Sequence, residues 1–526
     1  MTPTDLTRFR LKEGTVRFMT IPELSVSKTG SHIAEYTHDR LSFMRRVVTE
    51  CGALGRASFQ GRPVLVVSGP EVMHETLVEK AKAFRKWPLI RLVLYPLIGE
   101  GLFTSEGTHW RSQRRLMAPI FKPDQVATYA QHMTQEALRS VLHVREGEGI
   151  SVADLTTRIA MGVVGRSLFD ADMCARPGPG TGHQASEADQ LAEALTVALR
   201  WTDEQVARVP TYIQLALREW LEGLGEKRPG AVRRLTEHAL DYLELPLSYR
   251  LSRRKTGVRA AVQVIDASIE RMLVARRKAG LAGDDLLTRL LRARSEDGTE
   301  GLTDRQIRDQ AVNLFIGGHE TTATAMAWAL HELAKAPALY RQVQAEGDAL
   351  GGRTPRMDEL RELSTCMRVF KEALRMYPPV YAYGRQAIED LTIGGYEIPK
   401  GTVVLASAYG MHHNPAVYPE PERFDPDRFL PEVESARHRS AWVPFGNGPR
   451  VCIGNHFGLM EGQLVLAALS HRIEFQASPG SVVLPEPGAT LRPNGPMTMT
   501  ARLRNRSEAP QPAALLAQEA EIAALV

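Results

Sequence analysis

Cysteine is scarce in this chain of 526 residues, which contains only four. They lie far apart and form no Cys-x-x-Cys pair, which argues against a zinc cluster and against a disulfide framework: Cys51, Cys174, Cys366 and Cys452. We therefore expect a reducing compartment.

An excess of one charge and long apolar runs are also missing. The net charge is only +4, and basic residues are scattered among acidic ones, so no nucleic-acid footprint stands out. The N-terminus mixes Arg8, Arg10 and Arg17 into its apolar residues, and Arg91 interrupts the apolar stretch 88–99. Neither a signal peptide nor a membrane span is predicted, and we expect a soluble, cytoplasmic protein.

The composition is typical of a globular protein with a large core, because 43% of the residues are hydrophobic and 24% are charged. From residue 128 onward apolar residues recur mainly at helical spacing, as at 152–168, 262–291 and 304–336, whereas β-like runs occur at 63–68, 391–398 and 403–406. We predict a mainly α fold with a small β region. Its parts are an N-terminal arm (1–30), a single domain (31–504) containing a Pro- and Gly-rich loop at 174–185, and a C-terminal tail (505–526).

The segment 445–454 reads FGNGPRVCIG and places Cys452 among glycines, directly before a helical pattern. A thiolate that binds iron needs close approach, backbone N–H groups directed at the sulfur, and shielding from water. Gly446 and its neighbouring glycines permit the approach, and Arg450 could pair with a haem propionate through its planar guanidinium. The alternative is a buried structural cysteine beside a glycine-rich turn.

This segment resembles the cysteine loop of the cytochrome P450 family, in which Phe, Gly, Arg, Cys and Gly recur at the same spacing. The matching residues are Phe445, Gly448, Arg450, Cys452 and Gly454. The resemblance extends from the region of residue 59 to that of residue 499. It implies the P450 fold, in which a long distal helix and the cysteine loop enclose one haem b, with Cys452 as the iron ligand.

The run 304–336 should form that distal helix, because Thr303 and Gln306 fit a capping box. Gly317 and Gly318 lie in its middle, where each costs about 1 kcal/mol relative to Ala. Close helix packing is one explanation for the two glycines, and a flat cofactor lying against the helix is the other.

The resemblance extends to this helix, since Gly317, Gly318, Glu320 and Thr321 match the family's oxygen-activating motif. It implies that Gly318 contacts the haem. It further implies that Thr321 hydrogen-bonds the bound oxygen species while Glu320 helps to deliver protons, so that both act in catalysis. A Glu-Thr pair on a helix would otherwise be a solvated face.

Glu372 and Arg375 are spaced i,i+3 on a predicted helix, and an exposed pair of this kind would contribute only about 0.5 kcal/mol. In the family, Glu-x-x-Arg is buried and tied to a third arginine in a downstream Pro-Glu-Arg-Phe segment, which Arg423 matches. The resemblance implies a structural triad of Glu372, Arg375 and Arg423 that locks the cysteine loop.

Trp110 and Arg114 match the Trp-x-x-x-Arg pattern with which the family contacts a haem propionate, and His109 precedes them. Core packing would explain Trp110 by itself. Arg385 matches a position where many relatives place another propionate contact.

The resemblance implies a monooxygenase that inserts one oxygen atom from O2 into a C–H or C=C bond of a hydrophobic molecule such as a fatty acid, terpenoid, steroid or polyketide. The chain has no flavin- or nicotinamide-binding segment, so electrons should come from a ferredoxin-type donor and its NAD(P)H-dependent reductase. Arg111, Arg115 and Lys122 could form the docking face, although a solvated face explains them nearly as well. Two rival functions are a peroxide-driven peroxygenase and a non-catalytic haem sensor, and Glu320 and Thr321 argue against both.

Overall fold

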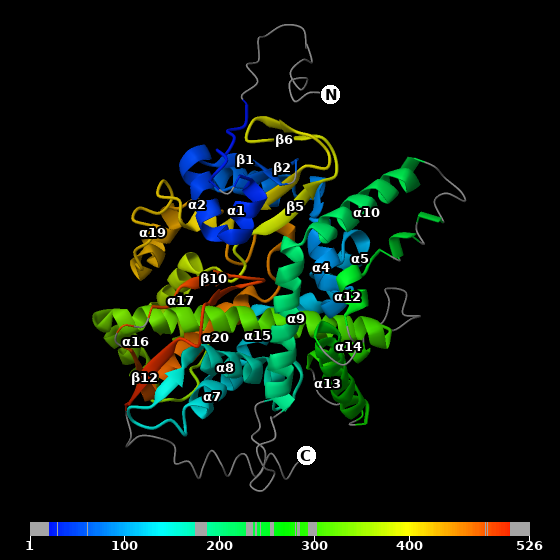
Figure 1. Ribbon diagram of the computed structural model, residues 1–526. Coiled ribbons are helices and arrows are strands. Elements are labelled where there is room, and N and C mark those ends of the chain that lie inside the picture. Colours follow the sequence, from blue (N-terminus) through cyan, green and yellow to red (C-terminus); the bar gives the residue numbers. More distant parts are fainter. Residues whose placement is uncertain are drawn as a thin grey trace.

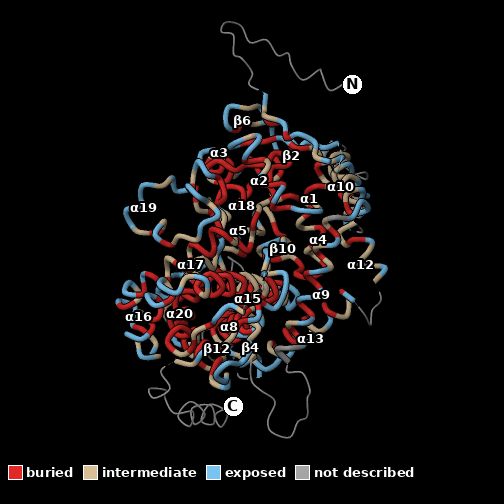
Figure 2. Tube along the Cα trace, turned by 60° about the vertical axis from the view of Figure 1, so that its left-hand side comes forward, coloured by how far each residue is buried: buried red, intermediate tan, exposed pale blue. Residues whose placement is uncertain are grey.

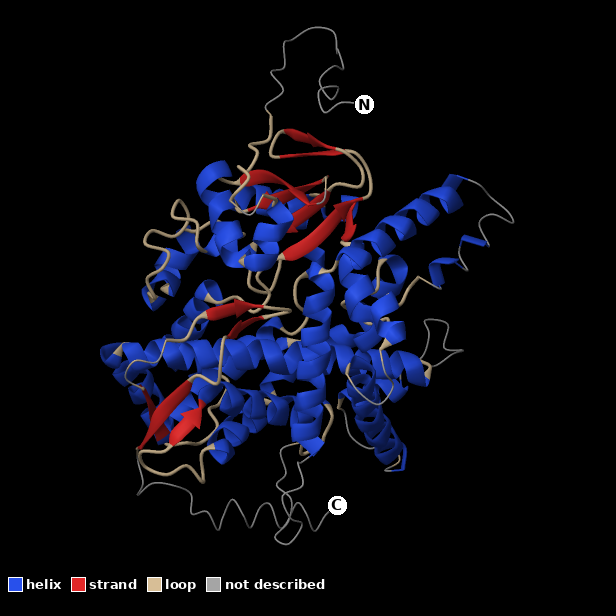
Figure 3. Cartoon of the chain, viewed as in Figure 1, coloured by secondary structure: helices blue, strands red, loops and turns tan. Residues whose placement is uncertain are grey.

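The computed structural model describes residues 20–504, apart from residues 29, 60, 174–186, 228–234, 237–238, 242, 253–256, 279, 281–284, 293–301, 479 and 481. Helices form most of this part, and the strands form small sheets (Figure 3). This agrees with the predicted mainly α fold. The predicted loop at 174–185 and the tail at 505–526 lie outside the described residues.

The helical body is built around α15 (Asp304–Lys335), which crosses the molecule (Figure 1) and is buried along most of its length (Figure 2). The helices with the most extensive contacts to it are α8 (Val152–Leu168), α17 (Ser364–Met376) and α20 (Asn455–Arg472). The other helices of the body are α4 (Pro88–Ile98), α5 (Gly107–Met117), α6 (Pro123–Ala127), α7 (Ala130–Ser140), α9 (Glu187–Ala207), α10 (Val209–Lys227), α12 (Leu247–Leu251), α13 (Val258–Lys278), α14 (Leu286–Arg292) and α16 (Pro337–Leu350).

The start of α15 is fixed as the sequence predicts. Thr303 Oγ1 accepts the Gln306 N–H at 3.2 Å, and Gln306 Oε1 accepts the Thr303 N–H at 2.8 Å, which completes a capping box. The helical pattern over 262–291 forms two helices, α13 and α14. Gly280 lies between them with φ +76°, a backbone conformation that ends a helix and favours glycine.

A five-stranded sheet lies at one end of the molecule (Figure 1), in the order β1 (Leu54–Phe59), β2 (Arg62–Val67), β8 (Val403–Ala406), β5 (Tyr383–Ala387), β3 (Phe84–Lys86). The smaller sheets pair β4 (Gly149–Ser151), β12 (Thr498–Leu503) and β9 (Ile473–Ala477), then β6 (Leu391–Ile393) with β7 (Tyr396–Ile398), and β10 (Pro485–Pro487) with β11 (Leu491–Pro493). The five short helices of this half are α1 (His32–His38), α2 (Arg40–Cys51), α3 (Pro70–His74), α18 (Ala408–His412) and α19 (Pro431–Ala436).

The fold begins inside the segment assigned above to the N-terminal arm. The Arg56 N–H donates to the Pro22 carbonyl at 2.8 Å, and the Leu24 N–H donates to the Arg56 carbonyl at 2.9 Å. This pairing buries Leu24 in the core, so the last residues of that segment pack on the sheet. The domain boundaries themselves stay a prediction.

None of the described helices combines the length and the apolar character that crossing a bilayer requires.

Candidate active site

Cys452 lies in a closed loop between the single turn η6 (Gly448–Arg450) and α20. Its N–H donates to the Phe445 carbonyl at 2.8 Å, which joins the two ends of the loop. The residue is solvent-accessible, yet desolvation by the surrounding protein raises the pKa of its thiol. The Gly454 N–H and Arg114 partly offset that rise. Cys452 is therefore accessible to a ligand, unlike the buried Cys366.

The glycines of this loop differ in how closely neighbouring residues approach them. A Cβ atom on Gly448 (φ +67°) would lie 2.0 Å from the Leu77 carbonyl oxygen, so this position needs glycine both for its backbone conformation and for the close approach of η1 (Glu75–Glu79). Gly446 has a similar φ of +72°, but its nearest neighbours would be 3.8 Å from a Cβ. Only the first position is sterically closed.

Tyr383 on β5 holds the cysteine loop from outside it. Its hydroxyl lies 2.8 Å from both the Val443 and Pro444 carbonyls and accepts the Gly446 N–H at 2.9 Å. Burial raises the Tyr383 pKa, so the phenol stays protonated as these contacts require. The sequence motif gave no sign of this tyrosine.

Three cationic side chains surround the Trp110 ring of α5. Lys86 Nζ lies 5.9 Å from the ring centroid, and the guanidinium carbons of Arg114 and Arg450 lie at 5.8 and 5.6 Å. Cations favour the face of an indole ring, which explains why Trp110 is at the centre of the group. Trp110, Arg114 and Arg450 thus lie together with Lys86, and the contact of the first three with haem propionates stays a prediction.

Arg385 extends this cation cluster, because it lies directly opposite Lys86 in the β3–β5 ladder, where like charges repel. Burial lowers the pKa of Lys86 to about 7 and that of Arg385 to about 10. Among the described residues the carboxylate paired with the cluster is Glu106, which binds Arg450 at 2.5 and 2.9 Å. Three arginines and the buried Lys86, with one carboxylate between them, fit an additional ligand that carries negative charge.

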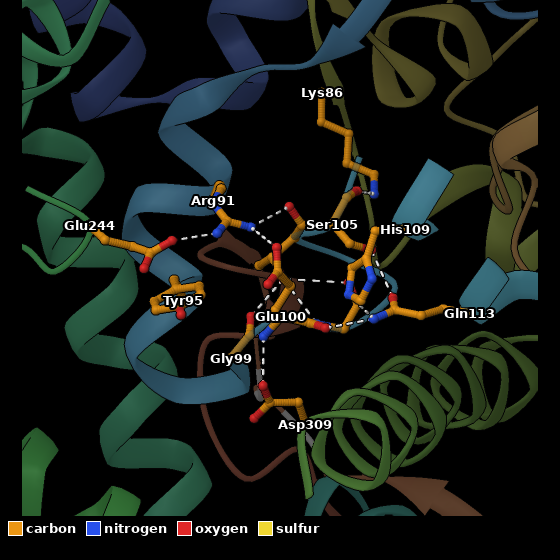
Figure 4. Close-up of polar contacts among 12 residues, drawn as sticks. Lys86, Arg91, Tyr95, Gly99, Glu100, Ser105, His109, Gln113, Glu244 and Asp309 are labelled. Carbon is orange, nitrogen blue, oxygen red and sulfur yellow. Dashed lines mark hydrogen bonds and ion pairs between the residues drawn. The ribbon is translucent and has the colours of Figure 1, made fainter. Parts of the chain in front are cut away.

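His109 belongs to a different contact. Its Nε2 lies 2.6 Å from the Gln113 side-chain nitrogen, which also donates to the Glu100 carbonyl at 2.8 Å. Figure 4 shows this group together with Asp309 of α15, whose carboxylate accepts the Glu100 N–H at 2.8 Å. His109 thus helps to hold the 99–106 loop against α15, and its contact with a haem stays a prediction.

The two glycines of α15 face different neighbours. A Cβ on Gly318 would lie 2.9 Å from Val164 of α8, so close helix packing accounts for this glycine. A Cβ on Gly317 would lie 3.2 Å from the Phe103 ring, and Phe103 is 44% exposed although it lies against α15. The assignment of Gly318 as a haem contact remains a prediction.

Glu320 and Thr321 follow in the same turn of α15. The Thr321 hydroxyl donates to the Gly317 carbonyl at 2.7 Å, which leaves the oxygen free to accept a hydrogen bond. Glu320 Oε1 accepts from the Thr490 hydroxyl at 2.7 Å. Glu320 Oε2 is buried and has no hydrogen-bond partner among the described residues.

Glu372 and Arg375 form a buried pair on α17, each with 0% of its side chain exposed. Arg375 Nε and Nη2 donate to the two Glu372 oxygens at 2.7 and 2.8 Å, and Nη1 donates to the His412 carbonyl at 2.7 Å. Glu372 Oε1 also accepts the Asp425 N–H at 2.9 Å. The pair therefore joins α17 to two segments that lead toward the cysteine loop.

The third arginine beside Glu372 is Arg428, which corrects the expected triad with Arg423. Arg428 Nε lies 3.5 Å from Glu372 Oε1 and its side chain is 10% exposed, whereas the Arg423 side chain is 64% exposed and pairs with Glu420. Only the Arg423 carbonyl reaches Arg375. The cause is the turn η5 (Pro426–Phe429), capped by Asp425, which directs Arg428 inward.

Comparison with known proteins shows the family to which a chain with this site belongs. The family model described as Cytochrome P450 matches residues 29–220 and 230–500. The chain belongs to the cytochrome P450 family. Relatives of this P450 include two proteins of Streptomyces melanosporofaciens. Cyclooctatin synthase is 32% identical over 83% of this chain and 86% of the relative, and cyclooctat-9-en-7-ol 5-monooxygenase is 31% identical over 74% and 75%.

The P450 fold is also seen in a solved structure, the crystal structure of the cytochrome P450DA heme domain. It aligns with a TM-score of 0.74 and 25% identity, over 93% of this chain and 99% of the solved one. This P450 is an oxidoreductase of the monooxygenase type that holds a haem and uses a hydrophobic substrate, O2 and redox partners. The accessible Cys452 and the cation cluster fit a haem, whose iron takes a thiolate and whose propionates are anions.

Proposed function

We propose that this P450 oxygenates a terpenoid-type cyclic alkene or alcohol, using haem b bound through Cys452 and electrons from a ferredoxin-type donor. The observation that carries the proposal is the accessible but desolvated Cys452 thiol in its closed loop. The substrate class follows the names of two relatives, one of which denotes the alkenol cyclooctat-9-en-7-ol.

In this proposal Cys452 binds the iron, with Phe445 and Gly446 beside the ring. The haem propionates would supply the negative charge that balances the cation cluster of Lys86, Arg114, Arg385 and Arg450. Noncovalent haem b is favoured because covalent c-type attachment uses a Cys-x-x-Cys-His sequence, which this chain does not contain.

When bound, the haem supplies oxygen activation and the oxidation of the substrate. The protein's own part is to place the substrate and to handle protons. The Thr321 oxygen can accept a hydrogen bond while its own O–H donates to the Gly317 carbonyl. Glu320 Oε2, with no other partner among the described residues, can hold a proton beside it.

The accessible ring of Phe103 gives the substrate an apolar contact opposite the middle of α15. Asn313 of α15 fixes this residue, because its Oδ1 accepts the Phe103 N–H at 3.1 Å and its Nδ2 donates to the Ile98 carbonyl at 2.8 Å. A rigid, apolar wall favours a compact hydrocarbon ring system, whose shape complements it without polar anchors.

The donor protein should dock on the exposed face of α5 and the turn that follows it. Arg111, Arg115 and Lys122 are exposed there, while Trp110 and Arg114 of the same helix belong to the cation cluster. An acidic ferredoxin-type protein complements this surface.

Absorption spectroscopy tests the ligand first. The reduced, CO-bound wild-type protein should have the red-shifted Soret band of thiolate ligation, and Cys452→Ser should lose it. If both proteins gave the same band, Cys452 would not be the ligand. Turnover should then require NAD(P)H and both donor proteins. Equal product from hydrogen peroxide alone would favour the peroxygenase, and no turnover under either condition would favour the sensor.

Substrate titration tests the chemical class. Cyclic terpene alcohols should shift the haem spin state at lower concentration than linear fatty acids of equal carbon number. The reverse order would exclude the terpenoid proposal and leave the haem assignment intact.

A further inference from the structure

Glu320 is held from outside its own helix. Its Oε1 accepts the Thr490 hydroxyl at 2.7 Å, and Arg492 Nε lies 3.8 Å from the same oxygen. Only 11% of the Glu320 side chain is exposed, and its Oε2 has no partner among the described residues. One carboxyl oxygen is therefore bound to the β10–β11 hairpin, and the other stays available.

The turn that carries Thr490 is anchored by parts of the protein other than α15. The Gly488 carbonyl accepts the Tyr381 hydroxyl at 2.7 Å and Arg40 Nη1 at 3.2 Å. Arg40, which is buried, also donates to Tyr381 at 2.7 Å and to Asp203 at 2.8 Å. The hairpin lies beside α15 in Figure 1, and its turn is also bonded to Arg40 of α2 and to Tyr381.

We propose that Thr490 is a positioning residue that fixes the Glu320 carboxyl group for proton delivery. The proposal rests on the function proposed above for Glu320. A carboxyl group on a three-bond side chain samples several rotamers, and a hydrogen bond to one oxygen selects one of them and aims the other oxygen. Without Thr490 the carboxyl group is free to turn toward Arg492, which lies 3.8 Å from Oε1, and Oε2 is then no longer aimed in one direction.

Two substitutions separate this role from a simple effect on the shape of the site. Thr490→Val keeps the shape and removes the hydroxyl, whereas Thr490→Ser keeps the hydroxyl and removes a methyl group. The positioning role therefore predicts a defect in the valine variant only, and a role in shaping the site predicts the larger defect in the serine variant.

The first readout is direct. In the haem-loaded protein the infrared band of the Glu320 carboxyl group is assigned by its loss in Glu320→Gln. We expect that band to shift in Thr490→Val and to return to its wild-type position in Thr490→Ser. An unshifted band in the valine variant overturns the proposal, because the contact would then be absent in solution.

The second readout is product formed per reduced nicotinamide consumed, with released hydrogen peroxide measured in parallel. Thr490→Val should lower this ratio about fivefold, the factor that corresponds to one net hydrogen bond, while leaving the substrate KM near wild type. Thr490→Ser should restore it. An unchanged ratio in the valine variant, whether or not its substrate KM rises, overturns the positioning role.

A third variant keeps the two proposals apart. If Glu320→Gln lowers the ratio and Thr490→Val does not, Glu320 carries protons but Thr490 does not position it. If Glu320→Gln leaves the ratio unchanged, both proposals fall. The double variant should be no worse than Glu320→Gln alone, because both changes remove one pathway, and additive losses would contradict the coupling.

Discussion

The buried pair on α17 gives the sharpest test of how the cysteine loop is supported. Glu372→Gln removes the negative charge but nearly keeps the side-chain volume. The Arg375 guanidinium, which donates to both Glu372 oxygens, would stay fully buried without its counter-charge. Arg428, 3.5 Å from the same carboxylate, would lose its partner too.

Removing one member of a buried ion pair costs about 3 to 5 kcal/mol, because the remaining charge is desolvated without compensation. A second pair in this chain offers a matched control. Glu420 and Arg423 are also spaced i,i+3 but are mostly exposed, so Glu420→Gln should cost no more than about 1 kcal/mol.

Urea unfolding followed by circular dichroism measures both costs, and the haem absorbance of the purified protein measures cofactor retention. We expect Glu372→Gln to lose several kcal/mol and to purify with little haem, and Glu420→Gln to resemble wild type in both respects. A Glu372→Gln protein within about 1 kcal/mol of wild type with full haem content would refute the argument that the pair supports the loop.

Three further comparisons test other parts of the site. Burial raises the Glu461 pKa well above 4.5, so the folded protein keeps a proton that the unfolded chain releases above that pH. The free energy of unfolding of Glu461→Gln should therefore rise relative to that of wild type as the pH increases above about 4.5, by at most about 1.4 kcal/mol per pH unit, and a difference in urea unfolding that does not change with pH would contradict this. Gly448→Ala should lose most of the haem, whereas Gly446→Ala, whose added Cβ would make only ordinary van der Waals contacts, should cost only about 1 to 2 kcal/mol. Lys86→Met should weaken haem binding to the apoprotein about tenfold in a titration and the exposed Lys82→Met should not; equal affinities would exclude Lys86 from the site.

The sequence predicted those parts whose causes are local. The capping box that starts α15 spans four residues, and the glycines of the cysteine loop lie within ten residues of one another. Strand β8 was likewise visible as a short apolar run. In each case neighbours in the chain determine the backbone conformation, so a pattern of neighbours is enough to predict it.

The residues that hold these parts together could not be predicted from patterns of neighbouring residues. Tyr383 reaches the Gly446 N–H across 63 positions of the chain, and nothing in its neighbourhood indicates that contact. Arg385 becomes part of the cation cluster only because the β3–β5 register sets it opposite Lys86. Arg428 takes the place that was expected for Arg423 because a single capped turn directs its side chain inward. The spacing of the arginines in the sequence does not reveal that direction.

The cysteine loop and the α15 side of the site differ in how firmly they are held, and the difference fits the function of each. Around the cysteine loop a buried ion pair and the Tyr383 contacts act together, and breaking the pair would strand a buried charge, so Cys452 has little freedom to move. On the α15 side Glu320 is held by one hydroxyl, a contact whose net strength is about 1 kcal/mol. An iron ligand must stay in place through every turnover, whereas a proton carrier must exchange partners to reload. The one hydrogen bond from Thr490 is strong enough to select an orientation of the Glu320 carboxyl group and weak enough to break when Glu320 exchanges partners.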